Sequence, residues 1–508
     1  MQVTANRSPV RAHTTPLLAR NPKNGTLVVA DVDIRGSREC QVHVSTDEGR
    51  TWTPGGSIMV RPFTDCSIGA EYGPHAMPFY DRNGVLYVVT TANDPKDFIE
   101  ASRQPSTEFP RTRSFVPRHV YLSRSTDDGR TFTTGLAYEG PSGDPHHSYN
   151  YAPVGAVDPT DPSRIYVGWA QGEWQSPVEP VKAVVSASSD GGRSFGRPFD
   201  ISDKQGSEHP WVAVGTDGVV HAVYWSKGFN KPVINPNIPA PFAGRVDPVP
   251  IYYTRSTDHG QTWQRQELDP GNQKYYRPPV IAADPSSGAV YVAWYSTSEK
   301  VNYQLDGDGK VRSDIFLKVS PDGGRSWEPR RTVNDDAGKG VNHIGPGISI
   351  APNGRVDIAW DDFRDSPRPG ASPDRETGLG EIYYTFSTDG GRTFAPNMKV
   401  NDRAIDRALG TWSNNVGSHV AVGIASAADV AYFAWQDPRN ATTITNAEDV
   451  YFASLVLEEP DRAAGPAVLP LVIGGIALGM GLAMIFVWVA QRRLQPVDPA
   501  SRRLRRPA

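Results

Sequence analysis

The chain has 508 residues, a length that fits several ordinary domains or one large repeat array. Its 48 Gly and 45 Pro residues are too many turn formers for a helical protein, while 38% hydrophobic residues can supply a large core. The net charge of −4 excludes the electrostatic footprint of a nucleic-acid-binding protein, and two cysteines exclude a disulfide framework or a Cys-rich zinc module. The composition therefore indicates a large, turn-rich, all-β protein.

A recurring octet, Ser-x-Asp-x-Gly-x-(Ser/Thr)-(Trp/Phe), divides most of the chain into units. Its six copies begin at Ser45, Ser125, Ser188, Ser256, Ser320 and Ser387. The Ser and Asp side chains can bond backbone N–H groups, Gly permits a positive φ, and the aromatic ring can fill space between sheets. We therefore interpret the Asp residues of the octets as turn-stabilising and not as catalytic acids.

Each unit carries the pattern of four short strands. Two strands precede the octet, as in Val280–Ala283 and Ala289–Trp294, and a third leads into it, as in Ile251–Thr254. A fourth strand leaves the octet, as in Arg331–Asn334. Repeats of four antiparallel strands at this period predict the blades of a β-propeller.

Counting units instead of octets gives seven blades over residues 1–458. The seventh unit contains the strand patterns Val420–Val422, Val430–Trp435 and Val450–Ser454 but has neither an octet nor a fourth strand. Residues Gln2–Asn6 are similar to the strands that leave the octets, so we predict that the N-terminal strand completes the last blade and removes an open sheet edge. A six-bladed ring is the alternative.

Octets of this kind on a propeller resemble the Asp boxes of the sialidase (neuraminidase) superfamily and its bacterial BNR-repeat relatives. The resemblance spans residues 1–458 and is densest in the first unit, from Pro16 to the first octet. It implies recognition of a carbohydrate or acidic glycan, and exo-sialidase-like hydrolysis by an Asp acid/base and a Tyr nucleophile assisted by a Glu. On this basis Asp33 (or its neighbour Asp31), Glu208 and Tyr451 are the candidate catalytic residues.

The family also binds the substrate carboxylate with an arginine cluster, which this chain matches only in part. Thr14-Thr15-Pro16 replaces the family's Arg-Ile-Pro motif, and Arg11 is out of register. Arg277 is the candidate carboxylate ligand. Further candidates are Arg35, Arg364 and Arg439, which recur as Asp-x-Arg at the end of the second strand in three consecutive blades. These arginines either form internal ion pairs or bind an anionic ligand bidentately.

The long insertions lie on one face of the predicted ring, where binding sites are usually built. They are 93–118, 226–250, 296–314 and 362–380. Cys40 and Cys66 lie on the same face and are predicted to form a disulfide that closes a 26-residue loop.

Polar residues near the start of each inner strand are predicted to line the channel mouth, and His13, His75 and His343 among them are candidate substrate-binding residues. No metal-ligand spacing motif accompanies these histidines, so hydrated channel lining is preferred to a metal site. No cofactor is expected.

The segment 467–490 contains no charged residue and is long enough to cross a membrane as a helix of about 36 Å. An Arg-rich tail, 491–508, follows it. Because positive charge beside a membrane span favours the cytoplasmic side, we predict a cytoplasmic tail, a linker over residues 459–466 and a propeller outside the plasma membrane. The N-terminus does not read as an export signal, so the signal lies upstream or has been removed; a tail-anchored cytoplasmic protein is the rival interpretation.

The sequence thus predicts a single-pass, extracytoplasmic propeller that recognises a glycan. Whether it hydrolyses that glycan stays open, and a non-catalytic glycan- or protein-binding scaffold is the alternative. The oligomeric state is not predicted.

Overall fold

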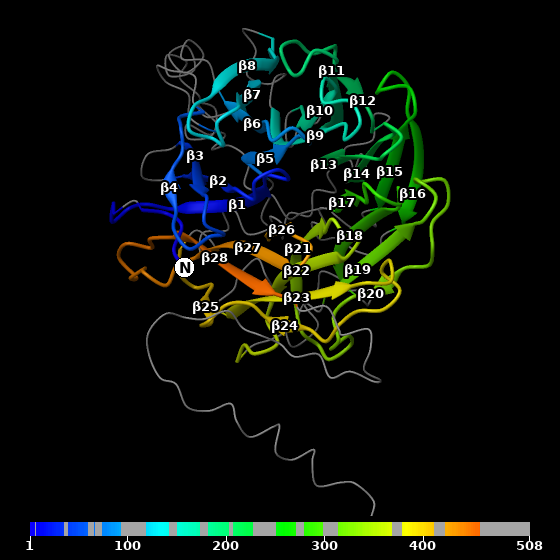
Figure 1. The fold of residues 1–508 in the computed structure, drawn as a ribbon. Helices are drawn as coiled ribbons and strands as arrows, with labels where there is room; N and C mark the ends of the chain where they lie inside the picture. Colours follow the sequence, from blue (N-terminus) through cyan, green and yellow to red (C-terminus); the bar gives the residue numbers. More distant parts are fainter. Residues whose placement is uncertain are drawn as a thin grey trace, which may run out of the picture.

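The computed structural model describes residues 1–5, 7–34, 39–58, 66, 74–92, 118–141, 150–172, 181–202, 207–226, 250–270, 279–297, 313–367, 378–410 and 422–457. These residues form seven antiparallel sheets around a central axis (Figure 1). The prediction of an all-β, seven-bladed propeller is confirmed, and the six-bladed alternative is wrong.

The first three blades each contain four strands, paired in sequence order. Their bounds are β1 (His13–Arg20), β2 (Leu27–Asp33), β3 (Cys40–Ser45) and β4 (Thr53–Pro54); β5 (Ala76–Tyr80), β6 (Leu86–Ala92), β7 (His119–Ser125) and β8 (Thr133–Tyr138); and β9 (Asn150–Val157), β10 (Ile165–Gln171), β11 (Lys182–Ser188) and β12 (Phe199–Asp200).

Blades four to six follow the same order, and a short strand, β25, also pairs with β23. Their bounds are β13 (Ser207–Val214), β14 (Val220–Ser226), β15 (Ile251–Ser256) and β16 (Gln264–Asp269); β17 (Val280–Ala283), β18 (Val290–Thr297), β19 (Ser313–Ser320) and β20 (Arg331–Thr332); and β21 (His343–Ile350), β22 (Val356–Asp362), β23 (Leu379–Ser387), β24 (Met398–Lys399) and β25 (Ile405–Asp406). Blade seven has three strands, β26 (Gly423–Ser426), β27 (Val430–Asp437) and β28 (Asp449–Val456).

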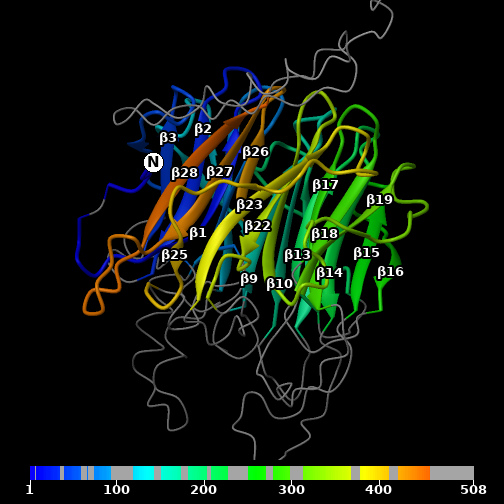
Figure 2. The ribbon, with the colours of Figure 1, turned by 90° about the horizontal axis from the view of Figure 1, so that it is seen from below.

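The ring is closed by the N-terminal segment, as the sequence predicts. The inner strands β1, β5, β9, β13, β17, β21 and β26 contact one another in a complete circle. Gln2 bridges to Tyr451 in antiparallel fashion, and the Val3 amide donates to the Val450 carbonyl at 2.7 Å. The Phe452 amide donates to the Met1 carbonyl at 2.8 Å. Residues 1–4 therefore lie along the outer edge of blade seven, beside β28 (Figure 2).

The hydrophobic core consists of layers between neighbouring blades. Second strands are buried on both faces, and alternate residues of β2 face opposite neighbours: Val28 and Val32 pack with residues of blade two, whereas Val29 packs with blade seven. Trp294 and Trp360 fill similar layers in blades five and six. Because each layer joins two blades, a blade cannot bury its apolar surface alone.

The six octets form turns with the same hydrogen bonds. In the first, Ser45 Oγ donates to Asp47 and accepts from the Gly49 amide, while both the amide and the hydroxyl of Thr51 donate to Asp47. Gly49 has a φ of 84°, and a Cβ there would overlap the ring of Phe452. These bonds hold the octet carboxylates in the ionised form: in the second octet, chiefly the Thr131 hydroxyl lowers the pKa of Asp127 to about 2. The octet Asp residues are thus turn-stabilising, as expected.

The last described residue, Leu457, donates its amide to the carbonyl of Asp429, in the turn that joins β26 to β27. Within the described ranges there is no helix long and apolar enough to span a membrane. The predicted linker, the 467–490 segment and the Arg-rich tail lie outside the described residues.

Deletion of residues 1–8 tests the ring closure. We expect the deletion to lower the free energy of unfolding by a few kcal/mol, since it removes several backbone hydrogen bonds and exposes the edge of β28 to aggregation. Calorimetry measures the change in Tm, and deletion of residues 501–508 at the other end of the chain is the control. An unchanged Tm after the N-terminal deletion would contradict the closure.

Candidate functional site

The propeller has two faces with different functions in the fold. At one end of the ring the inner strands begin and the second strands end, and we call this end the loop face. The opposite end carries the octets, and we call it the octet face. The four long insertions predicted from sequence join β6 to β7, β14 to β15, β18 to β19 and β22 to β23, so all of them leave from the loop face. The residues of these insertions are largely outside the described set, but the strand ends that frame them are described.

A strained bulge recurs where inner strands begin. Thr15, Ala152 and His209 have φ angles of 54°, 52° and 51°, and each precedes a proline. A residue before proline favours extended backbone, and a non-glycine residue in the left-handed region adds strain. In blade one the strand register shifts between Thr14 and Leu17, and the side-chain oxygen of Gln436 accepts from the Thr15 amide at 3.0 Å. The bulge thus connects blade one to blade seven.

Blade one contains a buried cluster of His13, Asp31 and His43. His13 Nδ1 lies 2.5 Å from one oxygen of Asp31, and His43 Nε2 lies 2.8 Å from the other. The three residues come from β1, β2 and β3, and their side chains are at most 6% exposed. Burial opposes both charges, but the opposite charges and their hydrogen bonds outweigh it: the pKa of His13 is raised and that of Asp31 is lowered.

A second cluster, in blade six, has His343 at the position equivalent to His13. His343 Nδ1 donates to the Ser313 carbonyl, and Nε2 lies 3.0 Å from Asp336 and 3.4 Å from Asp362. Arg364 bonds both carboxylates and Asp335 as well. This cluster is a buried ion-pair network whose acidic groups are matched by a guanidinium.

Arg439 in blade seven repeats the arrangement of Arg364. It bonds Asp437 at 2.6 Å and Asp402 at 2.9 Å, and its guanidinium lies 3.9 Å from the centre of the Tyr451 ring. Of the two alternatives for the Asp-x-Arg pairs, these contacts favour the internal ion pair for Arg364 and Arg439, because their donors are already occupied. Arg35 and Arg277 lie outside the described residues.

The candidate catalytic residues Asp33, Glu208 and Tyr451 lie in blades one, four and seven. Tyr451 is in the third strand of blade seven, and its hydroxyl contacts the amides of Asn440 and Gln2, while burial raises its pKa. Glu208 is in the inner strand of blade four, paired with Trp225, and its side chain is outside the described set. Tyr451 therefore has two amide side chains at its hydroxyl, whereas a contact between it and the Glu208 carboxylate falls outside the described set. Asp33 is buried and accepts the Ala12 amide at 3.0 Å.

The candidate histidines are buried and do not face open water. His13, His75 and His343 are 0%, 2% and 1% exposed. The physical reason, for the first and last, is that a neighbouring strand of the same blade supplies Asp31 or Asp362 as a partner. The expectation of a hydrated channel lining therefore does not describe these three side chains.

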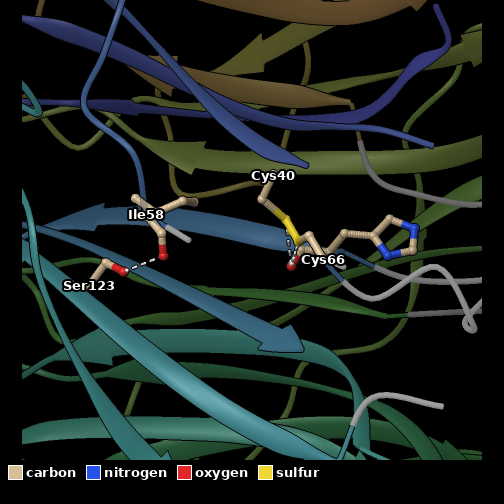
Figure 3. Close-up of a disulfide and its surroundings, with 5 residues drawn as sticks. Cys40, Ile58, Cys66 and Ser123 are labelled. Atoms are coloured by element: carbon tan, nitrogen blue, oxygen red, sulfur yellow. Dashed lines mark hydrogen bonds between the residues drawn. A yellow bond between two sulfur atoms is a disulfide. The ribbon is translucent and has the colours of Figure 1, made fainter. Parts of the chain in front are cut away.

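The structure contains the Cys40–Cys66 disulfide, with the two Cα atoms 5.4 Å apart (Figure 3). It joins the start of β3 to the connection that precedes blade two, where Cys66 bridges to Ala92. The carbonyl oxygen of His75 lies within 3.9 Å of both sulfur atoms. Closing a loop of this length adds about 3.5 kcal/mol in the chain-entropy estimate, and it fixes the loop face beside blade one.

The sequence analysis missed His43 and Gln436, and it named Asp31 only as an alternative to Asp33. The signal for His43 was present, because it stands two residues before its octet serine, where the other five octets follow Ser, Thr or Lys. The signal for Asp31 depends on strand pairing, since the connections between the second strands and the octets differ in length. Gln436 had no such signal, since its role depends on the bulge at Thr15.

No protein-family model matches the chain, and no curated protein matches it. Solved structures that match include a protein of unknown function from Dyadobacter fermentans, with 17% identity and a TM-score of 0.45 over 76% of this chain and 97% of that one. A Hadza microbial sialidase matches with 15% identity and a TM-score of 0.42 over 84% and 75%. A polysaccharide lyase of an ulvan-lyase family matches with 12% identity and a TM-score of 0.48 over 88% and 94%.

The blade-six network predicts a pH dependence of stability. Burial lowers the pKa of His343, but its bond to Asp336 and the charge of Asp362 outweigh burial, so the pKa in the folded state lies above 6.5. The stabilisation is therefore complete below pH 6.5 and is lost as the pH rises through the folded-state pKa. We expect Tm of the parent to fall by ~1–3 °C more than that of His343→Asn between about pH 6 and 9.

Asn150 occupies the equivalent position in blade three, so this variant supplies a residue that the fold accepts. His259→Asn, in an octet on the other face, is the matched control and should keep the slope of the parent. Equal slopes for the parent and His343→Asn would show that His343 carries no charge in the folded protein.

Proposed function

We propose that the protein recognises a carbohydrate or acidic glycan at its loop face. The observation that supports this proposal is the asymmetry of the ring: the long insertions and the buried His–Asp and Arg–Asp clusters gather at one face, and the repeated octets occupy the other. A rigid ring with elaborated connections on one side is a common way to build a binding site. The carbohydrate class rests on the likeness of the octets to those of the sialidase superfamily.

Recognition is better supported than sialidase-type hydrolysis. A Tyr nucleophile needs a nearby base, whereas the Tyr451 hydroxyl contacts two amide side chains and its pKa is raised. Arg364 and Arg439 are held by aspartates. A screen of fluorogenic glycosides, including sialosides, together with glycan-array binding of the full chain decides between a hydrolase, a glycan-binding module and a scaffold that binds no glycan.

Arg277 is the residue whose loss tests glycan binding. It lies three residues before β17, in a connection that leaves from the loop face, and arginine recognises carboxylates through planar, bidentate bonds. We expect Arg277→Ala to weaken binding of an array-identified acidic glycan by at least about tenfold, or 1.4 kcal/mol. Asp258→Ala, in an octet, is the control and should lower Tm without changing affinity. Parent-like affinity in folded Arg277→Ala would refute the assignment.

We further propose that segment 467–490 anchors the protein in the plasma membrane with the propeller outside. The described chain ends at Leu457 on the octet face, so a short linker would turn the loop face away from the bilayer, toward external ligands. Protease added to intact cells should release the propeller and leave an epitope tag on the C-terminal tail protected. Release only after lysis would place the propeller in the cytoplasm.

A further inference from the structure

Blade one departs from the repeat at a position that is aromatic in most other blades. In each blade that has an octet, one residue of the second strand pairs with the octet serine. The position compared lies four residues after that residue. This position is Asp31 in blade one and Thr90 in blade two, and it is aromatic in the next four blades: Trp169, Tyr224, Trp294 and Trp360. A carboxylate at a fully buried position of a repeat core is costly unless it is matched by charge or ligand. Asp31 therefore calls for an explanation beyond packing.

Blade one departs again two residues before its octet serine. The equivalent residues of blades two to six are Ser123, Ser186, Thr254, Lys318 and Thr385. Three of these hydroxyls donate to a backbone carbonyl near the outer strand: those of Ser186, Thr254 and Thr385. In blade one the residue is His43, which contacts Asp31 instead. Two departures that meet in one cluster are unlike the independent drift of two core positions.

We propose that His13, Asp31 and His43 form a binding site for a divalent metal ion of the zinc class. The three side chains come from three adjacent strands, and one ligand atom of each lies within 4.8 Å of the others. Two imidazole nitrogens and a carboxylate oxygen form a donor set typical of zinc and of cobalt or nickel in its place. Three protein ligands leave a fourth coordination position for water or a ligand.

The local charge favours a cation. The contacts that the structure gives to the Asp31 carboxylate come from the two imidazoles, without a Lys or Arg among the described residues that touch it. The carboxylate of Asp33 adds negative charge around His13, whereas that of Asp449, which also acts on His13, is paired with Arg11. In addition, His13 Nε2 is a buried nitrogen without a hydrogen-bond partner among the described residues, as is His343 Nε2 in blade six; the His13 ring contacts Asp31 through Nδ1 and the ring of His43 at its edge.

The blade-six cluster shows why a comparable set of residues does not form such a site. There one oxygen of Asp362 already accepts from Trp360 Nε1 and from Nε and Nη2 of Arg364. The guanidinium of Arg364 also bonds Asp336, so a positive group stands where a metal ion would have to bind. The two clusters therefore provide a test site and an internal control within one chain.

The experiment measures zinc binding to the full chain without a histidine tag, purified in detergent and stripped with a chelator. After addition of Zn²⁺ and gel filtration, we expect one equivalent of zinc on the parent and a higher Tm than in the stripped protein. His43→Thr restores the type of residue that the repeat carries at this position and should weaken zinc binding at least about tenfold. With Co²⁺ as the probe, the visible absorption of the bound ion should be lost in the same variant.

His343→Asn is the matched control and should retain zinc, because it removes a histidine from the cluster that contains Arg364. Asp31→Asn, which keeps the shape of the side chain, replaces His43→Thr if the latter fails to fold. The proposal would be overturned if the parent bound no more zinc than His43→Thr or Asp31→Asn. Loss of zinc in His343→Asn would also overturn it. Because these readouts involve no glycan, the metal site stands or falls separately from glycan recognition.

Discussion

The burial of apolar surface between neighbouring blades is the interaction on which the whole structure depends. The second strands present apolar residues on both faces, so each blade needs a neighbour on either side. A chain of such units has two unsatisfied ends unless it closes on itself. Here residues 1–4 pair with the outer edge of blade seven, and the contact between β1 and β26 completes the circle.

Closure also explains why polar groups concentrate where blades seven and one meet. Arg11 bonds Asp449 with two charge-assisted hydrogen bonds of 2.7 Å, and Thr4 donates to the same carboxylate. The side chain of Gln436 serves both the hydroxyl of Thr14 and the amide of Thr15. Each of these hydrogen bonds requires one donor opposite one acceptor, so they select the same register as the apolar pattern of the buried strands. The polar bonds therefore specify how the ends of the chain meet.

The fold followed from the sequence because its signals are local and repeated. The octets mark the turns, the short β-branched runs mark the strands, and the unit without a fourth strand matched the unpaired N-terminal segment. The candidate site could be predicted only in part. The position of His13 at the start of β1 could be inferred from its spacing to Pro16, but the partner of a buried histidine depends on strand register. The choice between the two roles of Arg364 and Arg439 depended on Asp335, Asp336 and Asp402, which are distant in sequence or carry no motif.

The pairing of residues 1–4 with β28 has a consequence for the synthesis of the protein. The amino group of Met1 bonds the carbonyl of Phe452, 451 positions along the chain, so residues 1–4 cannot pair until β28 has been made. While the ribosome completes the intervening blades, the N-terminal strand has no partner and blade one has an uncovered face. The entropy of closing so long a loop grows only slowly with its length, so the thermodynamic cost is modest. The delay is kinetic, and until β28 has been made it leaves an unpaired strand edge and exposed apolar surface, which favour aggregation.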